Sequence, residues 1–534
     1  MLPLLLFLVS IVLPGSLAHG PGKCVLTDTR DPAHELAPFS EAQAQIPWTS
    51  TFKDDFDVPP PPLEILSLVV SGPSSNRVDL IFFADGYVQD EREKFFEDAK
   101  RLAEDISGNQ TFNTVKPLMN FWAAFTPSKE SGVGVGGKPK NTAFGLYRDG
   151  TELRGVYYAK PAVAAAACSS LGDQCDYPIL LGNDPLYGGL GGRFTVITPS
   201  IANGALILRH ELGHSIINVG EEYDGGYAYF GSNSYNNLSK AVPWAQWLTD
   251  PDPTHVRVER AVMPMQAYAW TLLNTSTPWS VKFDSSGAYA RHLVRFSVSG
   301  LPEAADLRVE LDGEDLGWTP RADIGLDRYH YDVHRDGGLS AGEHTLSFTL
   351  LNGAREPEAQ MCSAEILEFG DESEFVATPG HYSLYPTFSL DNQTTYRPTN
   401  EDCLMRQVTT PNFCKACIEG LWLALLRNVS LIDGIDASCV GSAADEDLTK
   451  LTLRLVPLAQ FRAAAVAGLS ESYTVTWRKD GQVIGKFTNS TEAEVGSGQY
   501  TIEVQYATNE VRVDRDDRLK AQVQYTVDGG CTKS

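Results

Sequence analysis

Apolar residues in the first half of the chain form short runs that alternate with a helical pattern. Residues 78–84 form an apolar run that predicts a buried strand. Residues 90–106 follow with helical spacing, and one face of that helix carries Phe95, Phe96, Ala99 and Leu102. Further candidate strands lie at 121–126, 179–181 and 193–198. Because strands and helices alternate, this part of the chain is predicted to be α/β.

The pattern in the second half changes to short alternating strands with Asp-Gly turns. Two stretches look alike: residues 309–317 followed by 342–348, and residues 477–485 followed by 498–504. Each pairs a hairpin on an Asp-Gly turn with a strand that opens Gly-x-x-Thr. We interpret them as two small β-sandwich modules, although unrelated hairpins also resemble each other by chance. Residues 403–428, between the modules, are Cys-rich and then helical in pattern.

The first 18 residues have the features of a secretory signal peptide. An apolar region too short to span a bilayer is followed by small residues up to Ala18. Residues 19–60 are Pro-rich and polar, and the run 59–62 predicts a stiff spacer. No later stretch approaches the ~18 uninterrupted apolar residues of a membrane span. We therefore expect a secreted, extracellular protein without a membrane anchor.

Sequons and cysteines agree with secretion. Six Asn-x-Ser/Thr sequons are spread along the chain, at Asn109, Asn237, Asn274, Asn392, Asn428 and Asn489. The nine cysteines should mostly form disulfides in an oxidising compartment, and their odd number leaves at least one unpaired or intermolecular. Candidate pairs are Cys168 with Cys175, and Cys439 with Cys531.

One cysteine motif admits other interpretations. Cys414-x-x-Cys417 is a spacing found in zinc sites and in redox pairs. The chain has no second motif of this kind, and we expect it to be secreted. For these reasons we expect both cysteines to form disulfides.

Charge and glycine content narrow the choice of partners. The net charge of −25, from 68 acidic and 43 basic residues, argues against nucleic acid and anionic membranes as partners. The Gly-rich residues 187–192 lack the Gly-Lys-Ser/Thr ending of a phosphate-binding loop. Since they precede a candidate strand, we interpret them as a turn before an edge strand.

The most informative motif is His210-Glu211-Leu212-Gly213-His214, inside an apolar stretch without proline. Residues i and i+4 of a helix lie on one face, so the imidazoles of His210 and His214 can bind one Zn²⁺. Glu211 lies about 100° further round the helix, close to the metal but not bound to it. It can act as general base toward a zinc-bound water and then return the proton to the leaving amine. The alternative is a helix with two histidines that bind no metal.

A catalytic zinc site needs a third protein ligand, with the fourth position left for water. The metzincin spacing places Ile217 and Gly220 where that pattern has Gly and His or Asp, so it fails here. An acidic segment follows directly, and Gly220 is suited to end the helix so that the chain folds back. Candidates for the third ligand are, in order, Glu222, Glu221 and Asp224, and a carboxylate from a later element is the alternative.

These residues resemble the metallopeptidases named after a bacterial immunoglobulin A peptidase. The resemblance rests on His210-Glu211-Leu212-Gly213-His214 followed by Gly220-Glu221-Glu222-Tyr223, and it spans about residues 75–425, interrupted by the β-rich segment. It implies a zincin-type fold, one zinc ion and peptidase activity, with His210, His214 and Glu211 carried over. The family has Asp where this chain has Glu221, which leaves the third ligand open. Further matching segments are 83–87, 130–133, 141–145, 183–189, 396–398, 403–406 and 413–417.

Two other residues have candidate roles: Met405, on which the resemblance bears, and Tyr223, which lies beside the acidic pair. Met405 could be the methionine that lies under the zinc site in metzincins, or an ordinary buried methionine. Tyr223 could stabilise the oxyanion, or pack against the substrate or the core.

We therefore predict an α+β protein with a zincin-like metallopeptidase domain, an inserted β-rich module and a C-terminal β-sandwich. We expect a secreted, monomeric zinc endopeptidase that acts on proteins or peptides. The alternatives are a non-catalytic zinc-containing binding protein and a zinc esterase or amidase. The expected boundaries are a signal peptide at 1–18, a Pro-rich segment at 19–60, the first part of the catalytic domain at 61–290, the inserted β-sandwich module at 291–355, the Cys-rich, helical continuation of the catalytic domain at 356–440, and the C-terminal β-sandwich at 441–534.

Overall fold

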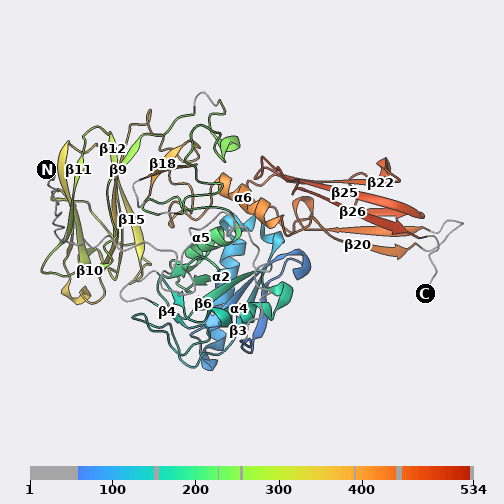
Figure 1. Cartoon of the computed structure of the whole chain (residues 1–534), viewed down its shortest axis with the longest axis horizontal. Helices are drawn as coiled ribbons and strands as arrows, with labels where there is room; N and C mark the ends of the chain where they lie inside the picture. Colours follow the sequence, from blue (N-terminus) through green and yellow to red (C-terminus); the bar gives the residue numbers. More distant parts are fainter. Residues whose placement is uncertain are drawn as a thin grey trace, which may run out of the picture.

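The computed structural model describes residues 58–528, apart from 149–154, 227, 253–255, 390–392 and 441–447. The expected signal peptide and nearly all of the Pro-rich segment lie outside the described residues. The chain forms three regions, with an α/β region, a β region built from the middle of the chain and a β region at the C-terminal side (Figure 1). The mixture of helices and several sheets is that of an α+β protein.

A six-stranded sheet forms the α/β region, in the order β1-β3-β2-β6-β8-β7. Strands β3, β2, β6 and β8 are parallel to one another, and β1 and β7 are antiparallel strands at the two edges. All the strands expected in this region are present. Their bounds are Glu64–Val69 (β1), Val78–Asp85 (β2), Met119–Phe125 (β3), Tyr177–Gly182 (β6), Gly189–Leu190 (β7) and Thr195–Ile197 (β8).

Both faces of this sheet are covered, which explains why β2 has no exposed residue. Leu80 and Phe82 belong to a core shared with the helices α2 (Arg92–Gly108) and α5 (Gly204–Ile216). Ile81 and Phe83 point to the other face, into a core shared with α4 (Pro161–Ser169). The helix expected at 90–106 is α2, and its buried residues include the four that were placed on one face. Short elements complete the region: α3 (Gln110–Asn113), β4 (Leu146–Tyr147) and β5 (Tyr157–Tyr158).

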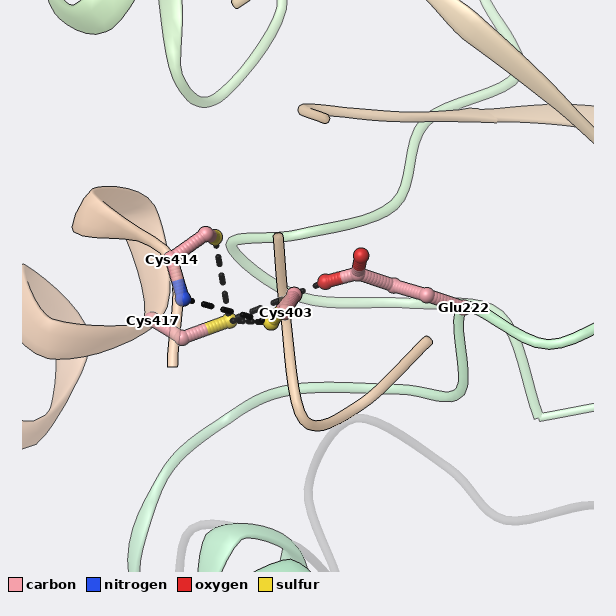
Figure 2. Close-up of side chains that lie close together, drawn as sticks. All are labelled: Glu222, Cys403, Cys414 and Cys417. Atoms are coloured by element: carbon pink, nitrogen blue, oxygen red, sulfur yellow. Dashed lines mark hydrogen bonds between the residues drawn. The ribbon is translucent and has the colours of Figure 1, made fainter. Parts of the chain in front are cut away.

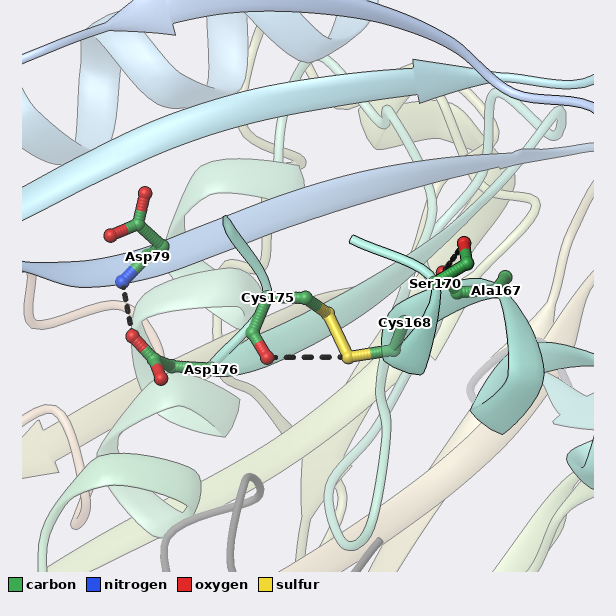
Figure 3. Close-up of a disulfide and its surroundings, with 6 residues drawn as sticks. All are labelled: Asp79, Ala167, Cys168, Ser170, Cys175 and Asp176. Carbon is green, nitrogen blue, oxygen red and sulfur yellow. Dashed lines mark hydrogen bonds between the residues drawn. A yellow bond between two sulfur atoms is a disulfide. The ribbon is translucent and has the colours of Figure 1, made fainter. Parts of the chain in front are cut away.

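A disulfide joins the end of α4 to the start of β6. Cys168 and Cys175 are bonded to each other and close a short loop, as expected from their spacing (Figure 3). Just beyond the loop, the backbone N–H of Asp79 donates a hydrogen bond of 2.8 Å to the carboxylate of Asp176. Cys439 is also disulfide-bonded. Its expected partner Cys531 lies outside the described residues, so this pairing stays a prediction.

The middle β region consists of two sheets that share one hydrophobic core. Phe296 of one sheet and Phe348 of the other meet with ring centroids 5.1 Å apart. One sheet contains β9 (Ala261–Ala267), β10 (Thr271–Leu272), β12 (Arg291–Ser299), β15 (Tyr329–Arg335) and β17 (Gln360–Phe369). The other contains β11 (Trp279–Ser285), β13 (Leu307–Leu311), β14 (Glu314–Asp315) and β16 (Gly342–Leu350).

These strands extend beyond the expected 291–355 at both ends. The cause is β17, a fully buried strand that pairs with both β12 and β9. The polar residues of β17 interrupt the apolar pattern that would identify a buried strand in the sequence. In the fold, residues of the neighbouring strands provide their hydrogen-bond partners. Ser363, for example, exchanges a hydrogen bond of 2.7 Å with Ser297 of β12.

The chain then returns to the α/β region before it enters the last region. Helix α6 (Lys415–Leu425) packs in the same core as α5, together with Leu404, Met405 and Phe413. A two-stranded sheet, β18 (Tyr385–Phe388) and β19 (Thr394–Arg397), precedes it. Within the described ranges, no helix is both long and apolar enough to cross a membrane.

The C-terminal region also has two sheets, and their buried residues join the core of α6. The strands are β20 (Ile432–Cys439), β21 (Thr449–Leu455), β22 (Glu471–Lys479), β23 (Gln482–Val483), β24 (Glu492–Val495), β25 (Gly498–Thr508) and β26 (Lys520–Val527). The first strand begins at Ile432, before the expected boundary at 441. Both expected Asp-Gly hairpins are confirmed: Asp312-Gly313 and Asp480-Gly481 all have positive φ, as such two-residue turns require.

Candidate metal centre

The two histidines of the sequence motif lie one turn apart on α5, and their ring centroids are 4.9 Å apart. The Nε2 atoms of His210 and His214 are 3.3 Å apart. Each Nδ1 lies 3.2 Å from a backbone carbonyl, that of Leu404 for His210 and that of Val219 for His214. A carbonyl can only accept, so each Nδ1 carries the proton and each Nε2 presents its lone pair. This is the tautomer that a metal ligand requires.

The residue that completes this pair is Glu221. Its carboxylate oxygens lie 3.0 Å from Nε2 of His214 and 3.4 Å from Nε2 of His210. The chain reaches this position by folding back, with the N–H groups of Gly220 and Glu221 donating to the carbonyls of Phe230 and Ala228. His210, His214 and Glu221 thus form a compact group of possible metal ligands.

The helix ends earlier than the expected position at Gly220. Its last residue is Ile216, and Ile217 is already extended. Gly220 is needed for a different reason, because a Cβ at this position would lie 2.4 Å from the carbonyl oxygen of Ala228. The early helix end explains which acidic residue reaches the histidines.

The structure does not bring the other two candidate ligands to the histidines. Glu222 points away from them, and its Oε1 accepts a hydrogen bond of 2.9 Å from Asn233. Asp224 is buried and pairs with Arg406 at 2.6 Å. Glu221, the second candidate from the sequence, therefore takes the place expected for Glu222.

The three ligand groups fit a zinc ion. An ion bound tetrahedrally at about 2.0–2.1 Å separates its ligand atoms by about 3.3 Å, close to the distances between these three residues. Both carboxylate oxygens of Glu221 are buried and find no hydrogen-bond partner among the described residues. A buried carboxylate without partners is costly, and a cation would offset that cost. Two histidines and one glutamate leave a fourth position open, as in catalytic zinc sites.

Charge interactions at the site also favour a bound cation. Burial raises the pKa of Glu221, but the nearby imidazoles outweigh burial and hold this pKa well below its ordinary value. Burial lowers the pKa of His210, and the carboxylates of Glu221 and Glu211 more than reverse this effect. The site is thus built around one anionic carboxylate that attracts positive charge.

Glu211 lies beside the histidines, where the sequence places the general base. It is buried, and burial raises the pKa of its carboxyl, although His210 and His214 oppose this shift. Two glycines of the Gly-rich stretch lie against it. A Cβ at Gly191 would lie 2.6 Å from Oε2 of Glu211, and a Cβ at Gly189 would lie 3.4 Å from its Oε1.

The Gly-rich stretch therefore has a role that its sequence does not reveal. Gly189 and Leu190 form the edge strand β7 itself, whereas the pattern suggested a turn before an edge strand. The glycines leave room for the carboxylate of Glu211 next to this edge. The sequence signal for this role is the pair of glycines at alternate positions, Gly189 and Gly191, that precede α5.

Met405 lies under the site. It is fully buried, and its Sδ would be 3.1 Å from a Cβ at Gly213, the residue before His214. The neighbouring residue Leu404 supplies the carbonyl that orients His210. The segment of Leu404 and Met405 thus supports α5 at the turn that carries both histidines.

A cavity of about 110 Å³ adjoins His210 and Glu211. Tyr223, one of the residues for which two roles were expected, lines it. Part of its lining comes from the middle β region, which the sequence did not connect with the site. The residues of this region that line the cavity are Tyr268, Arg295, Arg328, His330, Ser363 and Glu365.

The expectation that Cys414 and Cys417 form disulfides is wrong. Both are buried thiols outside any disulfide of the structure, as is Cys403. Cys414 and Cys417 lie beside Cys403 and Glu222 instead of paired in a disulfide, with 3.7 Å between their sulfurs. The argument from compartment and spacing failed because the fold places a third cysteine, Cys403, and the sequence-distant Glu222 beside them.

Comparison with known proteins finds a family model that matches part of the chain. The family model described as IgA Peptidase M64 matches residues 66–270, a range that includes α5, both histidines, Glu211 and Glu221. None of the curated protein sequences compared with the chain matches it.

The similarity to solved structures is weak. A β-porphyranase of glycoside hydrolase family 86 from Bacteroides plebeius is 12% identical over 21% of this chain and 20% of that chain, with a TM-score of 0.17. An exo-β-1,3-galactanase from Phanerochaete chrysosporium is 14% identical over 20% of this chain and 29% of that chain, with a TM-score of 0.13. The chain thus spans less than a third of the length of either structure.

Proposed function

Residues 66–270 belong to the IgA peptidase-type metallopeptidase family, and from this premise we propose that the protein is a secreted zinc-dependent endopeptidase. In this proposal His210, His214 and Glu221 bind the zinc ion. The observation that carries it is the convergence of two Nε2 atoms and one buried carboxylate within 3.0–3.4 Å. Glu221 replaces Glu222 as the proposed third ligand.

Bound zinc would lower the pKa of a water molecule at the open position and polarise the scissile carbonyl. Glu211 then has the role of proton carrier. Its carboxylate takes a proton from the attacking water and delivers it to the nitrogen of the leaving amine. Burial supports this role, because a raised pKa makes the carboxylate of Glu211 a stronger proton acceptor. No covalent intermediate with the protein is needed.

The surroundings of Glu211 support a polypeptide substrate. Strand β7 is at the edge of its sheet, so the backbone of an extended peptide could pair with it. This edge lies next to Glu211 through Gly189 and Gly191, which would place the scissile bond near the proposed base. The family name does not identify the substrate, and nothing here points to immunoglobulin.

We also propose the finer description of the fold. The α/β region with α5 and the returning segment that carries Met405 would be a zincin-like domain. The middle and C-terminal regions, each with two sheets around a common core, would be β-sandwich modules. The middle module would form part of the substrate site, since it lines the cavity at Glu211.

Secretion as a monomer remains part of the proposal. It is supported by the apolar N-terminal segment and by the disulfide between Cys168 and Cys175. The sequon asparagines within the described residues are exposed, as glycosylation requires: Asn109, Asn237, Asn274, Asn428 and Asn489.

The test compares the purified protein with a Glu211→Gln variant on a broad peptide library and on ester substrates. We expect the wild type to cleave peptides in a zinc-dependent manner and the variant to keep its zinc while losing cleavage. Selective ester hydrolysis would support the esterase alternative instead. If the zinc-loaded wild type cleaves nothing in the library, a non-catalytic binding protein becomes the better account.

A further inference from the structure

A second group of possible metal ligands lies on the other side of the segment that carries Glu221. The thiols of Cys403, Cys414 and Cys417 and the carboxylate of Glu222 point toward one another (Figure 2). Sγ of Cys417 is 3.8 Å from Sγ of Cys403, 3.7 Å from Sγ of Cys414 and 3.8 Å from Oε1 of Glu222. All four residues are buried.

These distances match a tetrahedral metal site better than a disulfide. A disulfide brings two sulfurs to about 2.05 Å. Four ligands around zinc, with Zn–S near 2.3 Å, place neighbouring sulfurs about 3.8 Å apart. The two printed sulfur–sulfur distances of this group lie within about 0.1 Å of that value. The backbone N–H of Cys414 also points to Sγ of Cys403 at 3.3 Å, a contact that stabilises a bound thiolate.

The carboxylate of Glu222 gives an independent indication that a cation belongs here. It is fully buried, and its Oε1 accepts hydrogen bonds from the amide of Asn233 at 2.9 Å and from the thiol of Cys417 at 3.8 Å. Its Oε2 has no hydrogen-bond partner among the residues that the structure describes. A buried carboxylate surrounded by three thiols is unfavourable unless a positive charge compensates it.

We propose that Cys403, Cys414, Cys417 and Glu222 bind a second zinc ion. Three thiolates favour zinc over magnesium or calcium, which prefer oxygen ligands. Because four protein groups surround this position, the site is closed and structural, unlike the open centre at His210 and His214. Binding releases the protons of the three thiols and protects them from oxidation outside the cell.

The proposed ion would support the catalytic centre through the backbone. Cys403 directly precedes Leu404, whose carbonyl orients His210, and Glu222 directly follows Glu221. The N–H of Glu222 donates a hydrogen bond of 3.0 Å to the carbonyl of Met405, which connects these two segments directly. The second ion would thus tie together the two chain segments that hold the catalytic ligands in place.

The experiment measures bound zinc and the spectrum of the cobalt-substituted full-length protein. The wild type should bind about two ions per chain, one at each site. Cobalt(II) at a site with three thiolates should give intense sulfur-to-metal charge-transfer absorption. Both Cys414→Ser and Glu222→Gln should reduce the zinc content by about one ion, and Cys414→Ser should weaken the charge-transfer bands.

Matched controls separate this proposal from the catalytic site. Cys362→Ser changes a buried cysteine outside the group and should leave both metal content and spectrum unchanged. His214→Ala should lose the other ion and keep the charge-transfer bands. If the wild type binds one zinc ion and shows thiolate charge-transfer bands, the result would contradict the catalytic centre and would support the second site. Two results would overturn the second site: one bound zinc ion without thiolate bands, or a disulfide between any two of the three cysteines in the native protein. Both are measured on the wild type, so they decide the question even if a cysteine variant fails to fold.

Discussion

Glu221 and Glu222 are consecutive in the chain, yet their carboxylates face two different groups of possible metal ligands. Glu221 lies 3.0 Å from Nε2 of His214, whereas Glu222 lies 3.8 Å from Sγ of Cys417. Both carboxylates are buried, and each has at least one oxygen without a hydrogen-bond partner among the described residues. Two adjacent residues thus belong to two separate sites, and changes at each should have separable effects.

The first prediction concerns this pair. Glu221→Gln should abolish zinc binding at the histidines and reduce peptide cleavage more than about 100-fold. Changing a residue that only hydrogen-bonds to a metal ligand typically costs about 10–100-fold. Zinc content and kcat/KM measure the two effects. Glu222→Gln is the control, and it should retain the ion at the histidines. If Glu222→Gln instead removes that ion while Glu221→Gln does not, the assignment of the ligands is reversed.

The second prediction concerns the space beside the proposed base. Gly191→Ala should displace the carboxylate of Glu211, since a Cβ would lie 2.6 Å from its Oε2. A displacement of about 1 Å can cost about 100-fold in rate, so kcat should fall by up to that factor with zinc content unchanged. Gly337→Ala, in open space on the middle β region, is the matched control. Unchanged kcat in Gly191→Ala would show that Glu211 does not need its present position.

The third prediction concerns the residue under the site. Met405→Ala should lower the free energy of unfolding by about 2–5 kcal/mol, because it leaves a cavity beside Gly213. Met405→Leu keeps the volume and should cost less than about 1.5 kcal/mol. Denaturant unfolding measures both. Zinc affinity should also fall in Met405→Ala, since the adjacent Leu404 orients His210, and equal stability of the two variants would contradict this packing.

The fourth prediction concerns the pH dependence of stability near the Cys168–Cys175 loop. Burial, opposed only partly by the N–H of Asp79, raises the pKa of Asp176 to about 7 (Figure 3). The folded state therefore binds this proton more tightly than the unfolded state. The stabilising contribution is complete below the ordinary aspartate pKa and is lost as pH rises through about 7.

Asp176→Asn removes this titration and still offers an oxygen to the N–H of Asp79. The variant should gain unfolding free energy relative to the wild type at pH 8, and less at pH 5. Asp284→Asn, at an exposed position of β11, is the control and should show no such difference. Urea unfolding at both pH values tests this, and an equal gain at pH 5 and pH 8 would contradict the raised pKa.

Much of the fold could be predicted because the local pattern matched the final environment. The apolar run of β2 indicated a strand buried on both faces, and the Asp-Gly dipeptides indicated the two-residue hairpins. Strand β17 could not be assigned in the same way. Its buried polar residues, such as Ser363, are satisfied only by strands from elsewhere in the chain.

In the candidate metal centre, too, some features follow from the local sequence and others depend on the rest of the fold. The spacing of His210 and His214 predicts that they lie on one face of a helix, and the structure places both on α5 with their Nε2 atoms 3.3 Å apart. The third ligand depends on where the helix ends and how the next residues turn, and that depends on contacts with Ala228 and Phe230. The free state of Cys414 could not be foreseen either, because Cys403 and Glu222 reach it only in the folded chain.

The most direct test of the central claim is a crystal structure of the zinc-loaded protein with anomalous data collected at the zinc absorption edge. The account predicts an anomalous peak bonded to Nε2 of His210, Nε2 of His214 and a carboxylate oxygen of Glu221, with Glu211 close by but not bonded. The absence of a peak at these three residues in the loaded protein, or a peak bonded to a different third ligand, would contradict it.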